Sequence, residues 1–468
     1  MVKMLCPIAL QAKENPTALA IETTLDSLSY QELDKLLSQL VKHLLSLGVS
    51  KGTRIAFVAP TSFKTVILLL ALLRMGAIAC PINPKFPQVQ IEDLIQRLKP
   101  SHFINLDTLV FTASSYQIDP IIDTEQLFTF LATSGSSGKS KIACHTFENY
   151  LTSALATHLP LQLSKSSRWL LSLPLYHVSG LSILIRCMTI GLCVVLTDLK
   201  SIWEEIIPHR ITHLSCVPTQ LFRLKDQKCS LPLLSKQLQC VLVGGAHTSL
   251  SLFQSVKELP IFFTYGMTET TSMITLATKE DLRLKNLSMG YPISCCEIKI
   301  ANDCEILVKG KNLFQGYWDG FQIHPPPCWF ATKDLGKICL HNHLHITGRK
   351  DRLFISGGEN IQPEEIEQAL CSIRGIICAT VLPKPDEEFG NRPVAFIEDI
   401  EQRSFAQVFF ELHKILPSFK CPVSIWPYPK HLKNTSVKTP IPLLEQHLKS
   451  LFPKDVFRDT PLTSMEEV

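Results

Sequence analysis

A loop rich in glycine, hydroxyl and lysine side chains occupies residues 133–141 (TSGSSGKSK), directly after the apolar run at residues 128–132. In such a loop, backbone N–H groups and hydroxyls can approach phosphate oxygens, and Lys139 and Lys141 supply positive charge. A Walker A loop is disfavoured, because threonine stands at position 133, where that motif requires glycine. The segment therefore predicts a phosphate-binding loop of another kind, with an ordinary surface loop as the alternative.

Four further polar motifs follow along the chain. They are LPLYHVSG at residues 173–180, VGGA at 243–246, TYGMTET at 264–270, and the pair TKDLG at 332–336 and TGRKD at 347–351. Together with the loop, in this order and spacing, they resemble the adenylate-forming superfamily, which includes acyl-CoA synthetases, luciferases and the adenylation domains of peptide synthetases. The resemblance extends from about Tyr30 to Lys438. It implies an AMP-forming acid:CoA ligase that uses ATP, Mg²⁺ and CoA.

The resemblance also implies which residues bind the nucleotide. Tyr265 would stack beside adenine, Asp334 would accept hydrogen bonds from both ribose hydroxyls, and Arg349 would hold ribose or phosphate through its guanidinium group. Glu269, together with Thr133, would hold Mg²⁺. The full set of residues implied to bind ATP is Thr133, Ser134, Gly135, Ser136, Ser137, Gly138, Lys139, Lys141, Gly244, Gly245, Tyr265, Gly266, Thr268, Asp334 and Arg349.

Two further residues are candidates for catalysis, beside Glu269. His177 resembles a residue that flanks the acyl pocket, and a buried core histidine is its alternative. Lys438 resembles the mobile lysine that bridges the acid and the α-phosphate during adenylation. The family pattern has glycine before that lysine, whereas this chain has valine, so Lys433 is kept as a second candidate and a solvated surface lysine as the alternative.

Four further segments of the sequence indicate which acid is the substrate. The segments at residues 174–186, 217–224, 356–367 and 387–395 resemble the members of the superfamily that ligate 2-succinylbenzoate to CoA in menaquinone biosynthesis. That acid has two carboxylates, so the one that is not activated needs a cation, which Arg186 would supply. An internal salt bridge is the alternative for Arg186. The pocket wall would be completed by Thr219, Gly245 and Ala246.

Two other functions stay open. The chain could ligate another aryl or acyl acid to CoA, or it could be a catalytically degenerate nucleotide-binding relative. The atypical lysine segment is the only support for a degenerate protein, while the intact set of Glu269, Asp334 and Arg349 argues against it.

Alternating helical and strand-like segments must position these motifs. Leucines recur at three- and four-residue steps over residues 29–47, which predicts an amphipathic helix capped by Ser29. Short apolar runs at 54–59 and 78–82 predict parallel strands joined by a helix closed at Gly76. The pattern continues to about residue 308, and short alternating strands follow, with a hairpin around His341, Asn342 and His343.

The fold class expected is α/β (mixed α+β), in two domains. Residues 1–350 would form a large N-terminal domain of packed α/β subdomains, and residues 351–468 a small mobile α+β domain carrying the adenylation lysine. A helix begins at Pro363 in the second domain, with acidic residues in its first turn. The resemblance implies rotation about Asp351 and a CoA path beside Gly357 and Gly358.

Composition excludes several classes of protein. The 468 residues are 46% apolar and 19% charged, which argues against a disordered chain, and the net charge of +4 gives no reason to expect nucleic acid as a partner. The most apolar run, residues 65–78, is too short to span a bilayer and contains Arg74, so no membrane insertion is expected. Sixteen cysteines without a CxxC pair indicate reduced thiols in a cytoplasmic protein. The expected partners are a carboxylic acid, ATP and CoA, and a homo-oligomer stays open.

Overall fold

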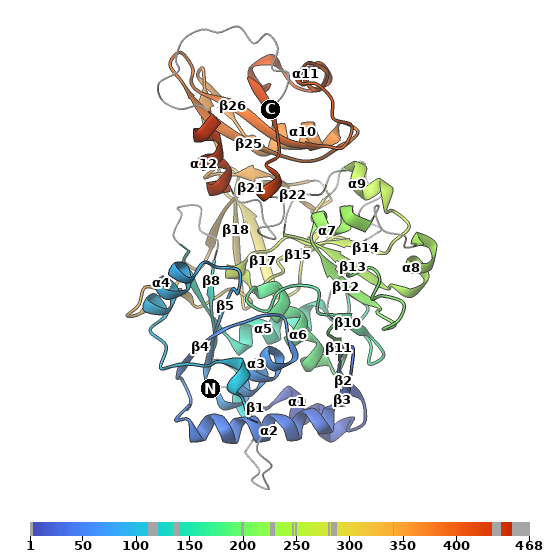
Figure 1. Cartoon of the computed structure of the whole chain (residues 1–468), viewed down its shortest axis with the longest axis vertical. Helices are drawn as coiled ribbons and strands as arrows, with labels where there is room; N and C mark the ends of the chain where they lie inside the picture. Colours follow the sequence, from blue (N-terminus) through green and yellow to red (C-terminus); the bar gives the residue numbers. More distant parts are fainter. Residues whose placement is uncertain are drawn as a thin grey trace. The chain divides into compact units, whose positions relative to one another are not determined.

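The structure is a computed structural model that describes residues 3–110, 120–133, 140–197, 201–224, 230–245, 248, 250–278, 281, 288–339, 341–432 and 441–451. The chain divides into two compact units, Met1–Asp351 and Arg352–Val468 (Figure 1). Each unit mixes helices and strands, as the sequence predicts. Among the described residues, no helix is both long enough and apolar enough to cross a membrane.

Within its described residues, the first unit contains two seven-stranded sheets. The first sheet runs in the order β14 (Ile261–Phe263), β13 (Cys240–Val243), β12 (His213–Cys216), β10 (Arg168–Leu170), β11 (Cys193–Val195), β2 (Leu19–Glu22) and β3 (Ser27–Ser29). The second runs in the order β20 (Ile323–His324), β19 (Gly316–Trp318), β9 (Ile142–Thr146), β8 (Leu127–Ala132), β5 (Ile78–Ile82), β4 (Arg54–Val58) and β6 (His102–Phe103).

Three apolar helices lie between these sheets: α3 (Phe63–Met75), α5 (Phe147–Thr157) and α6 (Val178–Ile190) (Figure 1). Helix α3 is buried over most of its length, and its side chains share one core with residues of both sheets. The remaining helices of the unit are α1 (Pro7–Glu14), α2 (Tyr30–Ser46), α4 (Gln88–Leu98), α7 (Pro218–Arg223), α8 (Leu231–Gln237) and α9 (Leu250–Ser255).

The local predictions for this unit are confirmed. Helix α2 begins after Ser29, whose hydroxyl accepts from the Glu32 backbone N–H while the Glu32 side chain accepts from the Ser29 backbone, a reciprocal capping box. Strands β4 and β5 pair in parallel, and helix α3 between them ends at Gly76. The left-handed φ of +68° at Gly76 favours glycine there.

Smaller sheets complete the first unit. Strands β17 (Cys296–Ile300), β18 (Glu305–Gly310), β21 (Phe330–Ile338) and β22 (Leu344–Arg349) form an antiparallel sheet, and β21 and β22 make the hairpin predicted around His341–His343. Two short pairs join β1 (Lys3–Leu5) to β7 (Ile121–Asp123), and β15 (Thr275–Leu276) to β16 (Tyr291–Pro292).

The second unit is built on a three-stranded sheet, β25 (Ile376–Asp386), β26 (Gly390–Asp399) and β27 (Ser424–Pro427). It also contains the pair β23 (Phe354–Ser356) and β24 (Glu359–Ile361), and helices α10 (Pro363–Ser372), α11 (Phe405–Leu412) and α12 (Ile441–Leu451). Helix α10 begins at Pro363 with Glu364 and Glu365 in its first turn, as predicted. The favourable interaction of these carboxylates with the helix dipole explains this start.

We expect Arg352→Met to lower the free energy of unfolding of the second unit by about 3 kcal/mol, because the arginine bridges two carboxylates at the base of α10. Its guanidinium lies 2.8 Å from Glu364 Oε1 and 2.7 Å from Glu367 Oε1. Burial raises the pKa of Glu367, and the charge of Arg352 opposes that rise.

The decrease in the free energy of unfolding caused by Arg352→Met should be larger at pH 7 than at pH 5. Without the arginine, the pKa of folded Glu367 rises further, so the stability of the variant falls as pH rises through that pKa. Urea denaturation at both pH values measures the effect. The control is Arg374→Met, since Arg374 is 96% exposed and should contribute almost nothing. A loss for Arg352→Met no larger than for the control would contradict the bridging role.

Candidate active site

Two of the motif segments, and Thr219, lie where adjacent parallel strands of the first unit end. Strand β13 is followed directly by Gly244 and Gly245, and β14 by Thr264 and Tyr265. Thr219 lies in the first turn of α7, just beyond β12. Because β12, β13 and β14 are adjacent and parallel, their carboxyl ends meet at one edge of the sheet. Ligands of open α/β sheets bind at such an edge, so the motifs are placed for one common site.

Four polar side chains form a connected network at this site. The Tyr265 hydroxyl donates to Asp334 Oδ2 at 2.6 Å, and Arg349 Nη1 donates to Asp334 Oδ1 at 2.8 Å. The other side of the same guanidinium contacts both Asp351 oxygens, at 2.9 and 3.1 Å. Burial raises the pKa of the Tyr265 hydroxyl well above its usual value, so it stays protonated and donates. The network fixes the Asp334 carboxylate from two sides, through the Tyr265 hydroxyl and the Arg349 guanidinium.

We expect Asp334→Asn to raise the KM for ATP by about 10-fold to 100-fold, because the amide cannot pair with Arg349 and accepts hydrogen bonds through only one atom. Initial rates at varied ATP concentration measure this effect. Asp303→Asn is the matched control, since Asp303 lies in the same unit and also pairs with a cation, Lys350, at 2.6 Å. An unchanged KM for ATP in Asp334→Asn would remove this residue from the nucleotide site.

The turn that carries Glu269 is tightly held. It is a short 3-10 helix, Thr268–Thr270, followed by left-handed residues Thr271 and Ser272. A Cβ at Gly266 would lie 1.4 Å from the Ser272 carbonyl oxygen, so only glycine fits there. Glu269 is 8% exposed, and its Oε1 accepts from the Tyr317 hydroxyl at 2.6 Å.

The buried His145 contacts the backbone of the same turn. Its Nε2 lies 2.7 Å from the Thr268 carbonyl oxygen, and burial lowers the pKa of this histidine to about 4. The ring is therefore neutral at physiological pH and donates its Nε2 proton to the carbonyl. The backbone beside Glu269 is thus fixed by an uncharged group.

The predicted phosphate loop is described only at its ends. The Thr133 N–H donates to the Lys141 carbonyl at 2.8 Å, which closes the base of the loop, and Thr133 is 8% exposed. The Lys141 ammonium lies 4.6 Å from the centre of the Tyr317 ring. The predicted loop residues that lie outside the described part of the chain are Ser134, Gly135, Ser136, Ser137, Gly138 and Lys139.

Glu269 and Thr133 suit a magnesium ion by their chemistry, because both offer hard oxygen donors. In the described residues, no group of three or more His, Cys, Asp or Glu side chains could hold a metal ion. Mg²⁺ is commonly held by one or two protein oxygens together with substrate phosphates, and this donor set fits that pattern.

The predicted acid pocket centres on helix α6. His177 precedes the helix, is half-buried, and its ring lies 4.6 Å from that of Tyr176, so it is not the fully buried core histidine of the alternative. A Cβ at Gly180 would lie 2.2 Å from the Pro174 carbonyl oxygen, which explains the glycine in this motif. The half-buried His177 ring is therefore fixed beside the start of the helix.

Arg186 is 2% exposed, and its side chain contacts three residues of the first unit. Its Nε donates to Thr157 Oγ1 at 2.9 Å, Nη2 lies 3.5 Å from Met273 Sδ, and the guanidinium stands 5.1 Å from the centre of the Trp169 ring. No carboxylate in the described part of the chain forms an ion pair with it. Burial lowers the pKa of Arg186 to about 10, so it remains cationic at neutral pH.

Two predicted residues, Gly357 and Gly358, belong to the second unit, where they form the turn between β23 and β24 with φ of +57° and +85°. Ala246, Lys433 and Lys438 lie outside the described residues. Four residues of the site were missed by sequence reasoning: His145, Thr157, Trp169 and Tyr317. Each lies in a helix or strand whose pattern indicates only core packing.

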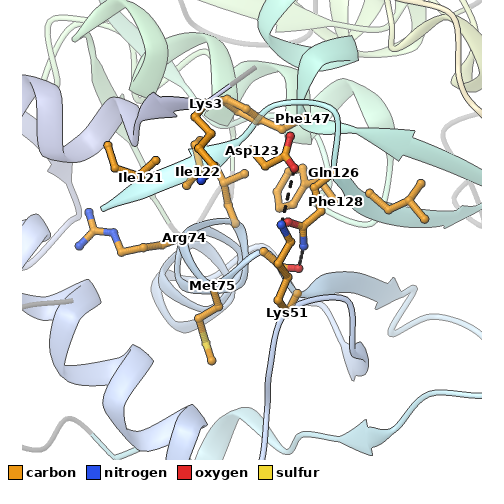
Figure 2. A pocket seen from close by; sticks show the side chains of 14 residues that line it. Lys3, Lys51, Arg74, Met75, Ile121, Ile122, Asp123, Gln126, Phe128 and Phe147 are labelled. Carbon is orange, nitrogen blue, oxygen red and sulfur yellow. Dashed lines mark hydrogen bonds and ion pairs between the residues drawn. The ribbon is translucent and has the colours of Figure 1, made fainter. Parts of the chain in front are cut away.

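A separate cavity of about 200 Å³ contains none of the predicted site residues. Figure 2 shows Lys51 beside Asp123 and Gln126 at its wall, with the Arg74 guanidinium pointing away. Lys51 Nζ lies 3.5 Å from Asp123 Oδ2, and the Gln126 side chain donates to the Gly76 carbonyl. Arg74 pairs with Asp34 at 2.6 Å. Lys51 and Arg74 are thus each paired with a carboxylate of the protein.

Comparisons with known proteins show the family to which the chain is similar. A family model described as AMP-binding enzyme matches residues 8–318. The 2-succinylbenzoate–CoA ligase of Haemophilus influenzae is 36% identical over 428 residues, which cover 89% of this chain and 92% of that protein. The enzyme of the same name from Escherichia coli is 33% identical, with 90% and 93% covered.

Two solved structures of the same kind of enzyme also resemble this chain. The o-succinylbenzoate CoA synthetase of Bacillus subtilis in complex with its acyl-adenylate intermediate superposes with a TM-score of 0.85, at 27% identity over 96% of this chain and 99% of that one. The same synthetase in complex with ATP and a magnesium ion gives a TM-score of 0.82, at 27% identity over 91% and 96%.

Proposed function

The chain belongs to the AMP-binding enzyme family, and from this membership we propose that it is the ligase that joins 2-succinylbenzoate to CoA in menaquinone biosynthesis. It is an AMP-forming acid:CoA ligase that uses ATP, Mg²⁺ and CoA. Relatives of this name align with almost the whole chain. No cysteine in the described part of the chain forms a disulfide, which supports a cytoplasmic location.

The reaction has two steps. A substrate carboxylate oxygen attacks the α-phosphorus of ATP, the bond to the bridging oxygen breaks, and pyrophosphate leaves. The CoA thiol then attacks the acyl carbon, and AMP leaves. In the first step Asp334 would hold ribose, Tyr265 would lie beside adenine, and Thr268 would contact the α-phosphate. Glu269 and Thr133 would hold Mg²⁺, which neutralises charge on the phosphates when it is bound.

One observation carries the choice of acid. A buried guanidinium without a carboxylate partner is costly, and a ligand carboxylate removes that cost. Arg186 is such a group among the described residues, held in place by Thr157 and the Trp169 ring. A dicarboxylic acid supplies one carboxylate for activation and a second one for Arg186. An acid with a single carboxylate leaves the cation unpaired.

The second unit would supply Lys438 for adenylation and then withdraw it by rotation about Asp351. Gly357 and Gly358, with left-handed backbone angles, would let the pantetheine arm of CoA approach closely.

Exchange of labelled pyrophosphate into ATP tests the proposal directly. We expect exchange to depend on 2-succinylbenzoate and to be much weaker with 4-oxo-4-phenylbutyrate and with 2-butyrylbenzoate, each of which lacks one carboxylate. Equal exchange with a monocarboxylate would favour the alternative, another aryl or acyl acid:CoA ligase. No exchange with any acid, in protein that is folded by circular dichroism, would favour a degenerate relative.

A further inference from the structure

A short segment around strand β19 joins the two parts of the site that face the phosphates. Strand β19 pairs with β9, with Tyr317 opposite Ala143, and β9 begins directly after Lys141. On the other side, the Phe314 N–H donates to the Glu269 carbonyl at 2.8 Å. The segment therefore connects the end of the predicted phosphate loop to the turn that carries Glu269.

Tyr317 contacts Glu269 through its hydroxyl and Lys141 through its ring. Its hydroxyl donates to Glu269 Oε1 at 2.6 Å, and its ring face lies 4.6 Å from the Lys141 ammonium. The edge of the Phe314 ring packs against it, with the ring centres 4.8 Å apart. One half-buried residue thus orients an anion and a cation.

We propose that Tyr317 is a positioning residue for the ATP–magnesium complex, acting on Glu269 through its hydroxyl and on Lys141 through its ring. This inference rests on the proposed function, since it assumes that Glu269 and Lys141 serve a metal–nucleotide complex. A hydrogen bond to a metal-binding carboxylate fixes its rotamer, and loss of such an outer partner commonly weakens metal binding about 10-fold to 100-fold. A cation near an aromatic face is attracted by the ring quadrupole.

Two substitutions separate the two contacts. Tyr317→Phe removes one oxygen atom and keeps the ring, so only the contact with Glu269 is lost. Tyr317→Leu removes both contacts. The matched control is Tyr30→Phe, because Tyr30 is fully buried in α2 and donates to the Leu192 carbonyl at 2.8 Å, so it loses an equivalent buried hydrogen bond away from the motifs.

The readout is binding of a fluorescent ATP analogue in the absence of acid and CoA, with and without Mg²⁺. We expect Tyr317→Phe to raise the Mg²⁺ concentration for half-maximal binding about 10-fold while metal-free binding stays as in the wild type. Tyr317→Leu should also weaken metal-free binding about threefold, which corresponds to a weak cation–π contact. Tyr30→Phe should leave both quantities unchanged.

Two results would overturn the proposal. One is an unchanged Mg²⁺ dependence in Tyr317→Phe, and the other is an equal loss of binding with and without Mg²⁺, which indicates a structural defect only. The double variant with Glu269→Gln gives a second check, because Tyr317→Phe should have no further effect once the carboxylate is gone. Because no acid is present, a wrong substrate assignment leaves this measurement intact, so the two proposals fail separately.

Discussion

Replacing Arg186 with alanine should lower kcat/KM for 2-succinylbenzoate by about a thousandfold, because removing one partner of a buried ion pair costs about 3–5 kcal/mol. The substrate carboxylate would enter a site where Thr157, Met273 and the Trp169 ring offer no positive charge. Initial rates of CoA thioester formation at varied acid concentration measure the loss. The substitution should change the kinetic constants for the acid and leave the KM for ATP unchanged.

A comparison of acids distinguishes this role from a structural one. The wild-type enzyme and Arg186→Ala should differ by less than about threefold with 4-oxo-4-phenylbutyrate or 2-butyrylbenzoate, whichever lacks the carboxylate that Arg186 binds. Arg186→Lys keeps the charge but loses the planar pair of donors, so it should recover part of the activity. An equal loss with all acids would contradict the assignment, since it would show that Arg186 only supports the fold.

Lys438→Ala should reduce adenylation by about a thousandfold, the usual size of the effect when one group that stabilises transition-state charge is removed. It should change thioester formation from a preformed acyl-adenylate by less than about threefold, because in that step the thiol attacks the acyl carbon and no pentavalent centre forms at the α-phosphorus. Pyrophosphate exchange measures the first step, and release of AMP from the synthetic adenylate on addition of CoA measures the second.

Lys433→Ala is the matched control, since it removes the same charge from the same segment. A large loss of adenylation in Lys433→Ala, with little change in Lys438→Ala, would transfer the role to Lys433. An equal loss of both half-reactions in Lys438→Ala would remove the lysine from the chemistry of either step. Both residues lie outside the described part of the chain, so the kinetics carry this assignment alone.

The parts of the fold that depend on neighbouring residues could be predicted from sequence. The helix after Ser29 follows from leucine spacing and a capping box that spans only three residues. The alternation of β4, α3 and β5 follows from local apolar runs and from Gly76. The sequence also indicates that the loop at residues 133–141 follows an apolar run, which the structure shows as strand β8.

Contacts between distant segments could not be predicted in this way. Tyr317 reaches Glu269 across 48 residues of sequence, and Arg186 reaches Thr157 across 29 and Met273 across 87. A tyrosine or a tryptophan in a short strand fits core packing equally well, and the local pattern gives no sign of the partner. The absence of a carboxylate around Arg186 in the described residues is likewise a property of the folded chain alone.

The network from Tyr265 through Asp334 and Arg349 to Asp351 has a thermodynamic consequence. Asp351 is the last residue of the first unit, and it shares one guanidinium with the carboxylate that would receive ribose. With the roles proposed above, nucleotide binding at Asp334 and a change of backbone conformation at Asp351 would be coupled through Arg349, with one coupling free energy. A bound nucleotide would shift the conformational equilibrium at Asp351 by a certain factor. The same conformational change would alter the affinity for the nucleotide by the same factor.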